Sequence, residues 1–217
     1  MAVKAKQAEG GRHRQARTRL ARRAVIDTAR TLFLERGYAA TTIDAISDRS
    51  DVPAATVYRL FPGKLGILTA VLDTSIAGDD EGLAVEDRPN VAALAAEPDP
   101  GTQLLGFAGI SVAINTRSAD VYRILGSAAG SDAETAALLS EYTRRRDAGQ
   151  GQIASLLARS RALRPGLKER DAADIIHALM SPELYRLLVI DRGWTPGRYE
   201  EWLAEALAAQ LLPGPVT

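Results

Sequence analysis

Apolar residues recur at helical spacing along most of the chain and predict a succession of helices. The first begins at Arg17, where an apolar face alternates with arginines. That face consists of Val25, Ile26, Ala29, Leu32 and Phe33. Gly37 then supplies a C-terminal stop. Residues 1–16 are short of large apolar side chains, so burial cannot offset the entropy of ordering them, and we expect a disordered basic arm there.

Two short helices are predicted next. Thr41, followed three residues later by Asp44, approximates a capping box with Asp in place of Glu and indicates where the second helix begins. Ser50-Asp51 interrupts that helix. Pro53 opens a third helix, which ends near Phe61, because the N–H that proline lacks would have no partner in a first turn.

The rest of the chain predicts more helices. A fourth starts at Lys64, after the Pro62-Gly63 turn, and the acidic stretch 78–82 predicts a loop. Further helices are predicted over residues 89–97, 102–117, 119–128, 132–161, 168–191 with a kink at Ser181-Pro182, and 197–212. No strand or hairpin signal appears with conviction, so we expect an all-α fold.

Composition bounds the class of protein. With 46% apolar residues, the 217-residue chain can bury a substantial core in one large domain or two small ones. The absence of cysteine excludes disulfides, a thiolate metal site and a cysteine nucleophile, and it suits a reducing compartment. No apolar stretch approaches the roughly 20 residues that span a bilayer, and the polar start lacks a signal peptide's apolar region. We therefore expect a cytoplasmic protein with no membrane partner.

The formal charge sums to zero, but it is distributed unevenly. Residues 1–64 carry 13 Lys or Arg against 6 Asp or Glu, a net charge of +7, whereas residues 65–217 carry 14 against 21, a net charge of −7. A basic third joined to an acidic remainder is expected if only the first part meets nucleic acid. The alternative is a basic arm that is merely solvated.

Two short helices joined by a tight turn, behind a capping helix and a basic arm, have the layout of a helix-turn-helix that reads DNA. The second helix must present small or polar residues near its N-terminus, because its backbone approaches base edges in a major groove only about 12 Å wide. Residues of that kind stand there: Pro53, Ala54, Ala55 and Thr56. By periodicity alone, the element could equally be another small helical subdomain.

Four further side chains are candidate phosphate contacts. Tyr58 and Arg59 lie one turn further along the third helix and can reach phosphate oxygens. Thr42 and Lys64 lie at helix N-termini, where backbone amides and the helix dipole favour an anion. Double-stranded DNA is therefore the predicted partner.

From Arg23 to about Val71, the chain also resembles the tetracycline-repressor-like (TetR) regulators. The matching positions fall in the right order and spacing across four helices. They are Ala29, Leu32-Phe33, Gly37-Tyr38, Ala40-Thr41-Thr42, Ile43, Ile46, Val52, Thr56-Val57-Tyr58-Arg59-Leu60-Phe61 and Lys64. The resemblance implies that Thr42, Tyr58 and Lys64 contact phosphates, that the exposed face of the third helix reads bases, and that the protein represses rather than activates transcription.

The resemblance also implies the domains: a basic arm over residues 1–16, a helix-turn-helix DNA-binding domain over 17–63, and a helical ligand-binding and dimerisation domain over 64–217. The turn departs from the family's usual Ala-Gly-Val-Ser, because this chain has Ser50-Asp51-Val52-Pro53. Asp can adopt the left-handed conformation that Gly takes, at some cost. Pro53 replaces the usual hydroxyl, so we expect the third helix to be capped differently.

The resemblance further implies a small-molecule effector, which we expect to be apolar, between the helices at 102–117, 132–161 and 168–180. The candidate lining residues mix apolar surface with a few polar tips and are Phe107, Ile110, Ser111, Ile114, Tyr142, Ile176, His177 and Met180. Each could instead be a core residue, or in one case a satisfied histidine. The apolar helices near 168–191 and 197–212 are expected to form a homodimer on a near-palindromic operator; alternatively, they only close the chain's own core.

Catalysis is not expected. The chain offers only His13 and His177 and no recognisable spacing of metal ligands, so we predict no catalytic residues, no metal and no cofactor. A class without DNA binding stays open, namely a helical carrier of small molecules or an interaction scaffold. Retention on DNA distinguishes the two classes.

Overall fold

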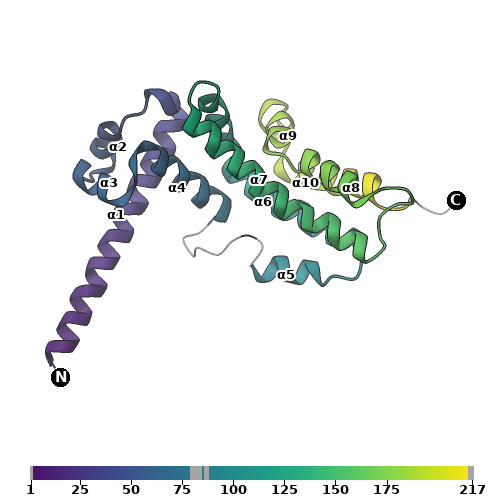
Figure 1. Cartoon of the computed structure of the whole chain (residues 1–217), viewed down its shortest axis with the longest axis horizontal. Coiled ribbons are helices and arrows are strands. Elements are labelled where there is room, and N and C mark those ends of the chain that lie inside the picture. The colour runs from purple at the N-terminus through teal and green to yellow at the C-terminus, as the bar shows by residue number, and fades with distance from the viewer. Residues whose placement is uncertain (1, 79–84, 86–87, 215–217) are drawn as a thin grey trace. The chain divides into compact units, whose positions relative to one another are not determined.

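The computed structural model describes residues 2–78, 85 and 88–214, with side chains from residue 15 onward. The described residues form helices and no strand, which confirms the all-α fold class (Figure 1). They divide into two compact units, Met1–Asp73 and Thr74–Thr217. The division falls inside the fourth helix, not before Lys64 as the expected domains have it, because the first turns of that helix are held to the N-terminal unit.

The N-terminal unit contains α1 (Ala2–Ala40), α2 (Ile43–Ser50), α3 (Ala54–Leu60) and most of α4 (Gly63–Ala77). Gly37, at φ 79° and ψ 170°, breaks the helical geometry of α1, as the predicted stop requires. The apolar stripe expected on α1 is buried together with apolar residues of the next three helices. The core residues of this unit include Val25, Ile26, Ala29, Leu32, Phe33, Ile46, Val52, Val57, Phe61, Ile67 and Leu68.

The start of α1 differs from the expected disordered arm. Residues 2–16 continue α1 as helix. Their Ala, Lys, Gln and Arg residues are good helix formers, and a helix that is already nucleated extends at little further cost. Helical structure here therefore does not require burial of apolar side chains.

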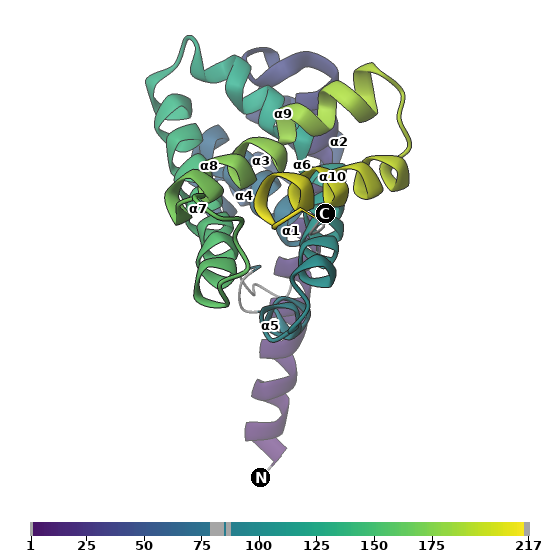
Figure 2. The same ribbon diagram turned by 90° about the vertical axis from the view of Figure 1, so that its right-hand side faces the viewer.

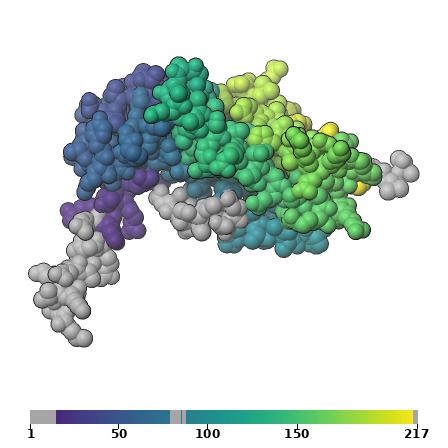
Figure 3. All heavy atoms as spheres, in the orientation of Figure 1, coloured from purple at the N-terminus to yellow at the C-terminus, as the bar shows by residue number. Residues whose placement is uncertain are grey.

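The C-terminal unit is a packed set of helices. Its elements are α5 (Pro89–Ala95), α6 (Pro100–Ala129), α7 (Ala133–Arg159), α8 (Glu169–Leu179), α9 (Pro182–Tyr185), η2 (Arg186–Asp191) and α10 (Pro196–Leu211). The long helix α6 packs against both α7 and α10, and α8 packs against α7 and α10 (Figure 2). In the space-filling view, the teal atoms of α5 lie along the lower edge of this unit (Figure 3).

One long helix, α6, replaces the two predicted over 102–117 and 119–128. Ser118 stands where the sequence suggests a break, but its Oγ donates to the carbonyl of Ile114 at 2.9 Å, within the helix. Because neither Gly nor Pro stands there, the backbone has no reason to leave helical geometry. The kink at Ser181-Pro182 is confirmed, since α8 ends at Leu179 and α9 begins at Pro182.

Among the described residues, no single helix is both long and apolar enough to cross a membrane, and one bent pair, α3 with α4, reaches that length and composition together. The predicted loop at 78–82 lies, after Gly78, outside the described residues.

Candidate nucleic-acid interface

Two adjacent threonines make different hydrogen bonds at the start of α2. Thr42 is the N-cap, and its hydroxyl accepts a hydrogen bond from the backbone N–H of Ala45 at 3.1 Å. Thr41 is fully buried and donates from Oγ1 toward the carbonyls of Gly37 at 2.8 Å and Leu32 at 3.3 Å. The capping pair predicted from Thr41 and Asp44 is thus displaced by one residue, because the hydroxyl of Thr41 serves the end of α1.

The turn between α2 and α3 has the geometry that the sequence predicts. Asp51 takes the left-handed conformation, with φ 54° and ψ 31°. Ser47 braces the turn from both sides: its carbonyl accepts from the N–H of Val52 at 3.3 Å, and its Oγ donates to the carbonyl of Val52 at 2.8 Å. The buried side chain of Val52 is thereby anchored between the two helices.

Helix α3 presents the face expected of a base reader. It begins after Pro53, which gives no side-chain cap, as expected. Val57 is fully buried and fixes which side of α3 faces the core. Ala55, Tyr58 and Arg59 are exposed on the remaining surface together with Pro53, and Ala54 and Thr56 are partly exposed.

Ionic contacts hold this motif to α1. The guanidinium of Arg49 donates two hydrogen bonds, at 2.6 and 3.0 Å, to the carboxylate of Glu35. These bonds lower the pKa of Glu35 and raise that of Arg49. The guanidinium of Arg22 lies 4.7 Å from the ring centroid of Phe61, the residue that ends α3. Both arginines therefore position α2 and α3 on the first helix.

Lys64 has intramolecular partners. Its ammonium donates to the carbonyls of Tyr38 at 2.8 Å and Ala39 at 3.3 Å and lies 4.3 Å from the ring centroid of Tyr38. These contacts tie the start of α4 to the segment that leads into Thr42. Lys64 thus lies near the N-terminus of α2 and helps to position it. Its contact with phosphate stays a prediction.

Comparison with known proteins bears on this motif. Residues 25–71 match the family model described as bacterial regulatory proteins, tetR family. Over these residues, the chain is similar to the tetR family. The HTH-type transcriptional repressor KstR of Mycobacterium tuberculosis is 34% identical over 71 residues, which cover 33% of this chain and 31% of the relative. The match therefore covers less than a third of the length of that relative.

Solved structures share the fold of this protein over most of the chain. NalD, the secondary repressor of the MexAB-OprM multidrug efflux pump in Pseudomonas aeruginosa, superposes with a TM-score of 0.69 at 23% identity, over 90% of this chain and 98% of that chain. FadR from Bacillus subtilis, in complex with stearoyl-CoA, gives 0.67 at 17% identity, over 85% and 96%. At these identities, the likeness concerns the fold.

Most candidate effector residues of the C-terminal unit lie in its packed core. Phe107, Ile176 and Met180 belong to the main apolar cluster, and Tyr142 is buried as well. Ser111 is buried, and its Oγ lies 3.5 Å from the carbonyl of Met180. Contact of these residues with an effector stays a prediction, because a helical period alone does not separate core positions from cavity walls.

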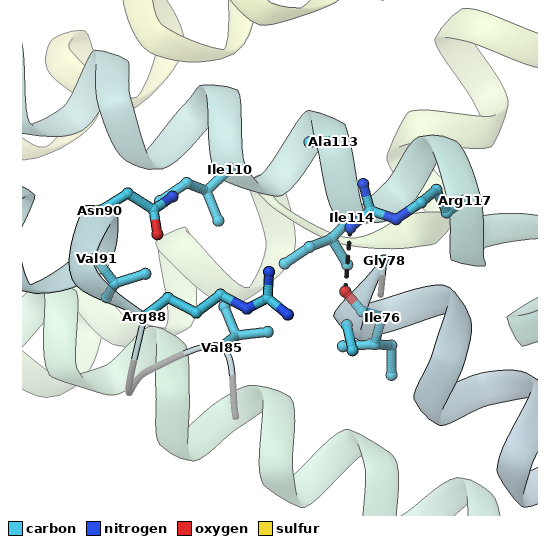
Figure 4. A pocket seen from close by; sticks show the side chains of 11 residues that line it. Ile76, Gly78, Val85, Arg88, Asn90, Val91, Ile110, Ala113, Ile114 and Arg117 are labelled. Atoms are coloured by element: carbon cyan, nitrogen blue, oxygen red, sulfur yellow. Dashed lines mark hydrogen bonds between the residues drawn. The ribbon is translucent and has the colours of Figure 1, made fainter. Parts of the chain in front are cut away.

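A different group of residues lines a cavity of about 230 Å³ within the same unit (Figure 4). Only Ile110 and Ile114 of the sequence candidates lie in it. Sequence reasoning missed the end of α4, the start of α5 and two arginines, Arg88 and Arg117. The sequence does contain a signal for Arg117, since it is the first charged residue of α6, after seventeen small, apolar or uncharged residues.

His177 has a basic neighbour that the sequence did not indicate. Its Nε2 lies 3.0 Å from Nη2 of Arg146, and since guanidinium only donates, Nε2 accepts and the ring is neutral. Burial, and then Arg146, lower the pKa of His177. Within the described part of the chain, no three His, Cys, Asp or Glu side chains gather in a way that could hold a metal ion.

The helices predicted to form a dimer combine core and surface. Tyr199, Leu203 and Leu207 of α10 are buried within this chain, so part of the apolar stripe does close its own core. Leu187 and Ile190 of η2 are half exposed, at 50% and 51%. The surface left for a partner is therefore smaller than the sequence alone suggests.

Proposed function

We propose that the chain is a ligand-responsive, DNA-binding regulator of transcription. The observation that carries the proposal is the braced turn between α2 and α3. It leaves the small and polar side of α3 exposed while Val57 is fully buried. The excess of basic residues in the first 64 positions supports DNA as the partner, because neutralisation of phosphates supplies most of the affinity in such complexes.

The proposed contacts divide by role. Pro53, Ala54, Ala55 and Thr56 face base edges, because small side chains allow the backbone of α3 to approach the groove floor. Thr42, Tyr58, Arg59 and Lys64 contact the phosphate backbone. Tyr58 supports this assignment, because it is 60% exposed although its ring would favour burial.

The regulatory features are part of the same proposal. We place the protein in the cytoplasm as a homodimer, and we propose that it is a non-enzymatic repressor. It would leave a near-palindromic operator when a small molecule binds the C-terminal unit. KstR and NalD are described as repressors, and FadR was solved with stearoyl-CoA, which supports repression and a ligand-binding role for this fold.

DNA selected from random sequence tests the function. Retention of the full chain should weaken as salt rises, with a log–log slope near −0.9 per phosphate contact. Lys64→Ala should weaken binding to all sequences by a similar factor, whereas Ala55→Ser or Thr56→Ala should change which sequence is preferred. Selective loss of one sequence in Lys64→Ala would contradict the phosphate assignment. No retention at low salt would instead favour a carrier or scaffold without DNA binding.

A further inference from the structure

The cavity of Figure 4 is lined by three elements of the C-terminal unit. Ile76 lies in the last turn of α4, Val91 belongs to α5, and Ile110 and Ile114 project from α6. Its volume, about 230 Å³, lies below the roughly 300–1,000 Å³ of sites for drug-sized ligands. The space therefore suits a small molecule with a short apolar body.

Two guanidinium groups give the cavity its polar character. Arg88 extends from the start of α5 toward Ile114 and Ile76, and Arg117 lies at the other end of the cavity (Figure 4). None of the described lining residues is acidic. Arginine recognises carboxylates and phosphates through paired hydrogen bonds, so two arginines beside branched apolar side chains match an amphipathic anion.

Arg117 also holds the end of α4. Its Nε donates to the carbonyl of Ser75 at 3.0 Å, and its Nη2 donates to the carbonyl of Ile76 at 3.1 Å. These carbonyls belong to the last turn of α4, which has no intrahelical partners for them. A cation at this end of a helix also opposes the negative pole of the helix dipole.

Gly78 makes this contact sterically feasible. The residue has φ +80°, and a Cβ there would lie 2.8 Å from Cζ of Arg117. Its N–H closes the helix by donating to the carbonyl of Thr74 at 2.8 Å. The guanidinium therefore rests against a backbone that has no side chain to obstruct it.

We propose that this cavity binds a small amphipathic anion whose charged head takes hydrogen bonds from Arg117 and Arg88, and that the anion thereby competes with the carbonyls of Ser75 and Ile76 for Arg117. The inference rests on the proposed function only in treating this ligand as the effector. A bound anion draws Arg117 away from α4, whose last turn then loses the cation that caps it. Helix α4 follows directly on the DNA-reading motif, so this turn is a point at which ligand binding can act on it.

Calorimetry with a matched series of eight-carbon ligands tests the binding site on the full chain. Octanoate and octyl phosphate supply the two kinds of anionic head, and octanol and octylammonium are the neutral and cationic counterparts. We expect an anion to bind at one site per chain, about tenfold or more tighter than octanol, because a hydrogen-bonded charge contributes more than a neutral group. Equal affinity for octanol or octylammonium would overturn the proposal.

Variants locate the site. Arg117→Gln and Arg88→Gln should each weaken anion binding about tenfold and leave octanol binding unchanged. Arg123→Gln is the matched control, because Arg123 lies on the same helix, is half exposed and does not line the cavity. If Arg117→Gln is unstable by circular dichroism, Arg88→Gln decides the question alone. Unchanged anion affinity in that variant, or an equal loss in Arg123→Gln, would refute the site.

Hydrogen exchange tests the competition at α4. Saturating octanoate should speed amide exchange at residues 75–78 about tenfold, which corresponds to the loss of one hydrogen bond to a charged group. Unchanged or slower exchange there would refute the competition. Calorimetry and hydrogen exchange use the protein without DNA. DNA retention is then measured on the same preparation. If the chain binds DNA but no anion, only this inference fails. If the chain binds an anion but no DNA, the proposed function fails.

Discussion

Asp51 holds a left-handed backbone conformation that glycine adopts more readily. Its φ of 54° lets the chain reverse between α2 and α3 while Val52 enters the core. Asn and Asp tolerate this region better than other side chains, but they still carry a steric cost there. The turn therefore contains a small amount of strain at one identifiable residue.

Replacing Asp51 should reveal that strain. Asp51→Gly is expected to raise the free energy of unfolding by up to about 1 kcal/mol, because the removed steric cost exceeds the added entropy of the unfolded chain. Ala45→Gly, in the neighbouring helix, should lower it by about 1 kcal/mol. Denaturant unfolding of both variants gives the comparison, and a destabilised Asp51→Gly would contradict the strain.

His177 should give the protein an acid-sensitive component of stability. Burial and the nearby Arg146 lower its pKa, against the weaker opposing effects of Asp147, Glu183 and Asp174. Between this lowered pKa and the value of 6.5 in the unfolded chain, the unfolded state binds more protons. Stability therefore falls as the pH decreases from about 6.5 and is insensitive to this group above that range.

A histidine variant isolates this component. Gln can accept the hydrogen bond from Arg146 but does not titrate, so His177→Gln should unfold with a shallower loss of stability between neutral pH and pH 5. Denaturant midpoints measured across that range provide the test. Parallel pH profiles for the two proteins would show that the ring does not contribute.

At the scale of elements, the break between α8 and α9 depends on buried hydrogen bonds. The N–H of Leu184 bonds to Oγ of Ser181, so it does not reach the carbonyl of Met180, four residues earlier. That carbonyl instead accepts from Nδ2 of Asn115 on α6 at 3.3 Å. The long helix α6 therefore supplies the partner that the broken helix lacks.

Removing this partner should be costly. Asn115→Ala removes the amide that donates to the buried carbonyl of Met180. The free energy of unfolding should therefore fall by about 1–3 kcal/mol. Gln152→Ala, on the exposed side of α7, should change it by less than about 0.5 kcal/mol. Chemical denaturation distinguishes the two, and equal effects would mean that the bond to Met180 is unimportant.

The elements show why some features follow from sequence and others do not. Periodicity and the Gly37, Pro53 and Pro182 signals locate most helices, because such signals depend on neighbouring residues only. The unbroken course of α6 and the placement of Arg117 against α4 depend on contacts distant in sequence. For the same reason, the predicted effector residues could not be separated from the core, while Arg88 was missed altogether.

At the scale of the whole molecule, the unequal charge of the two parts of the chain accompanies a division into two compact units. The basic residues that the sequence assigns to DNA binding fall in the first unit. The change of charge after residue 64 therefore lies close to the boundary between the units, which falls further along α4 than the sequence pattern indicates. The proposed pairing of chains depends instead on which apolar side chains remain at the surface.

Leu187 and Ile190 give the proposed homodimer a specific test. Leu187→Asp with Ile190→Asp should convert dimers to monomers and weaken operator binding, because burying the new carboxylates against a second chain is costly. Leu105→Asp is the control, since Leu105 is similarly exposed, at 49%, but lies on α6. Sedimentation velocity reports the outcome, and unchanged sedimentation of the double variant would exclude this surface.

Gly78 contributes no side chain, yet its position decides whether the guanidinium of Arg117 can rest on the end of α4. In a genetic selection for proteins that hold their operator but ignore the effector, we therefore expect substitutions at this glycine as well as at the side chains that line the cavity. A cavity residue without a side chain would then affect the response through the position of Arg117.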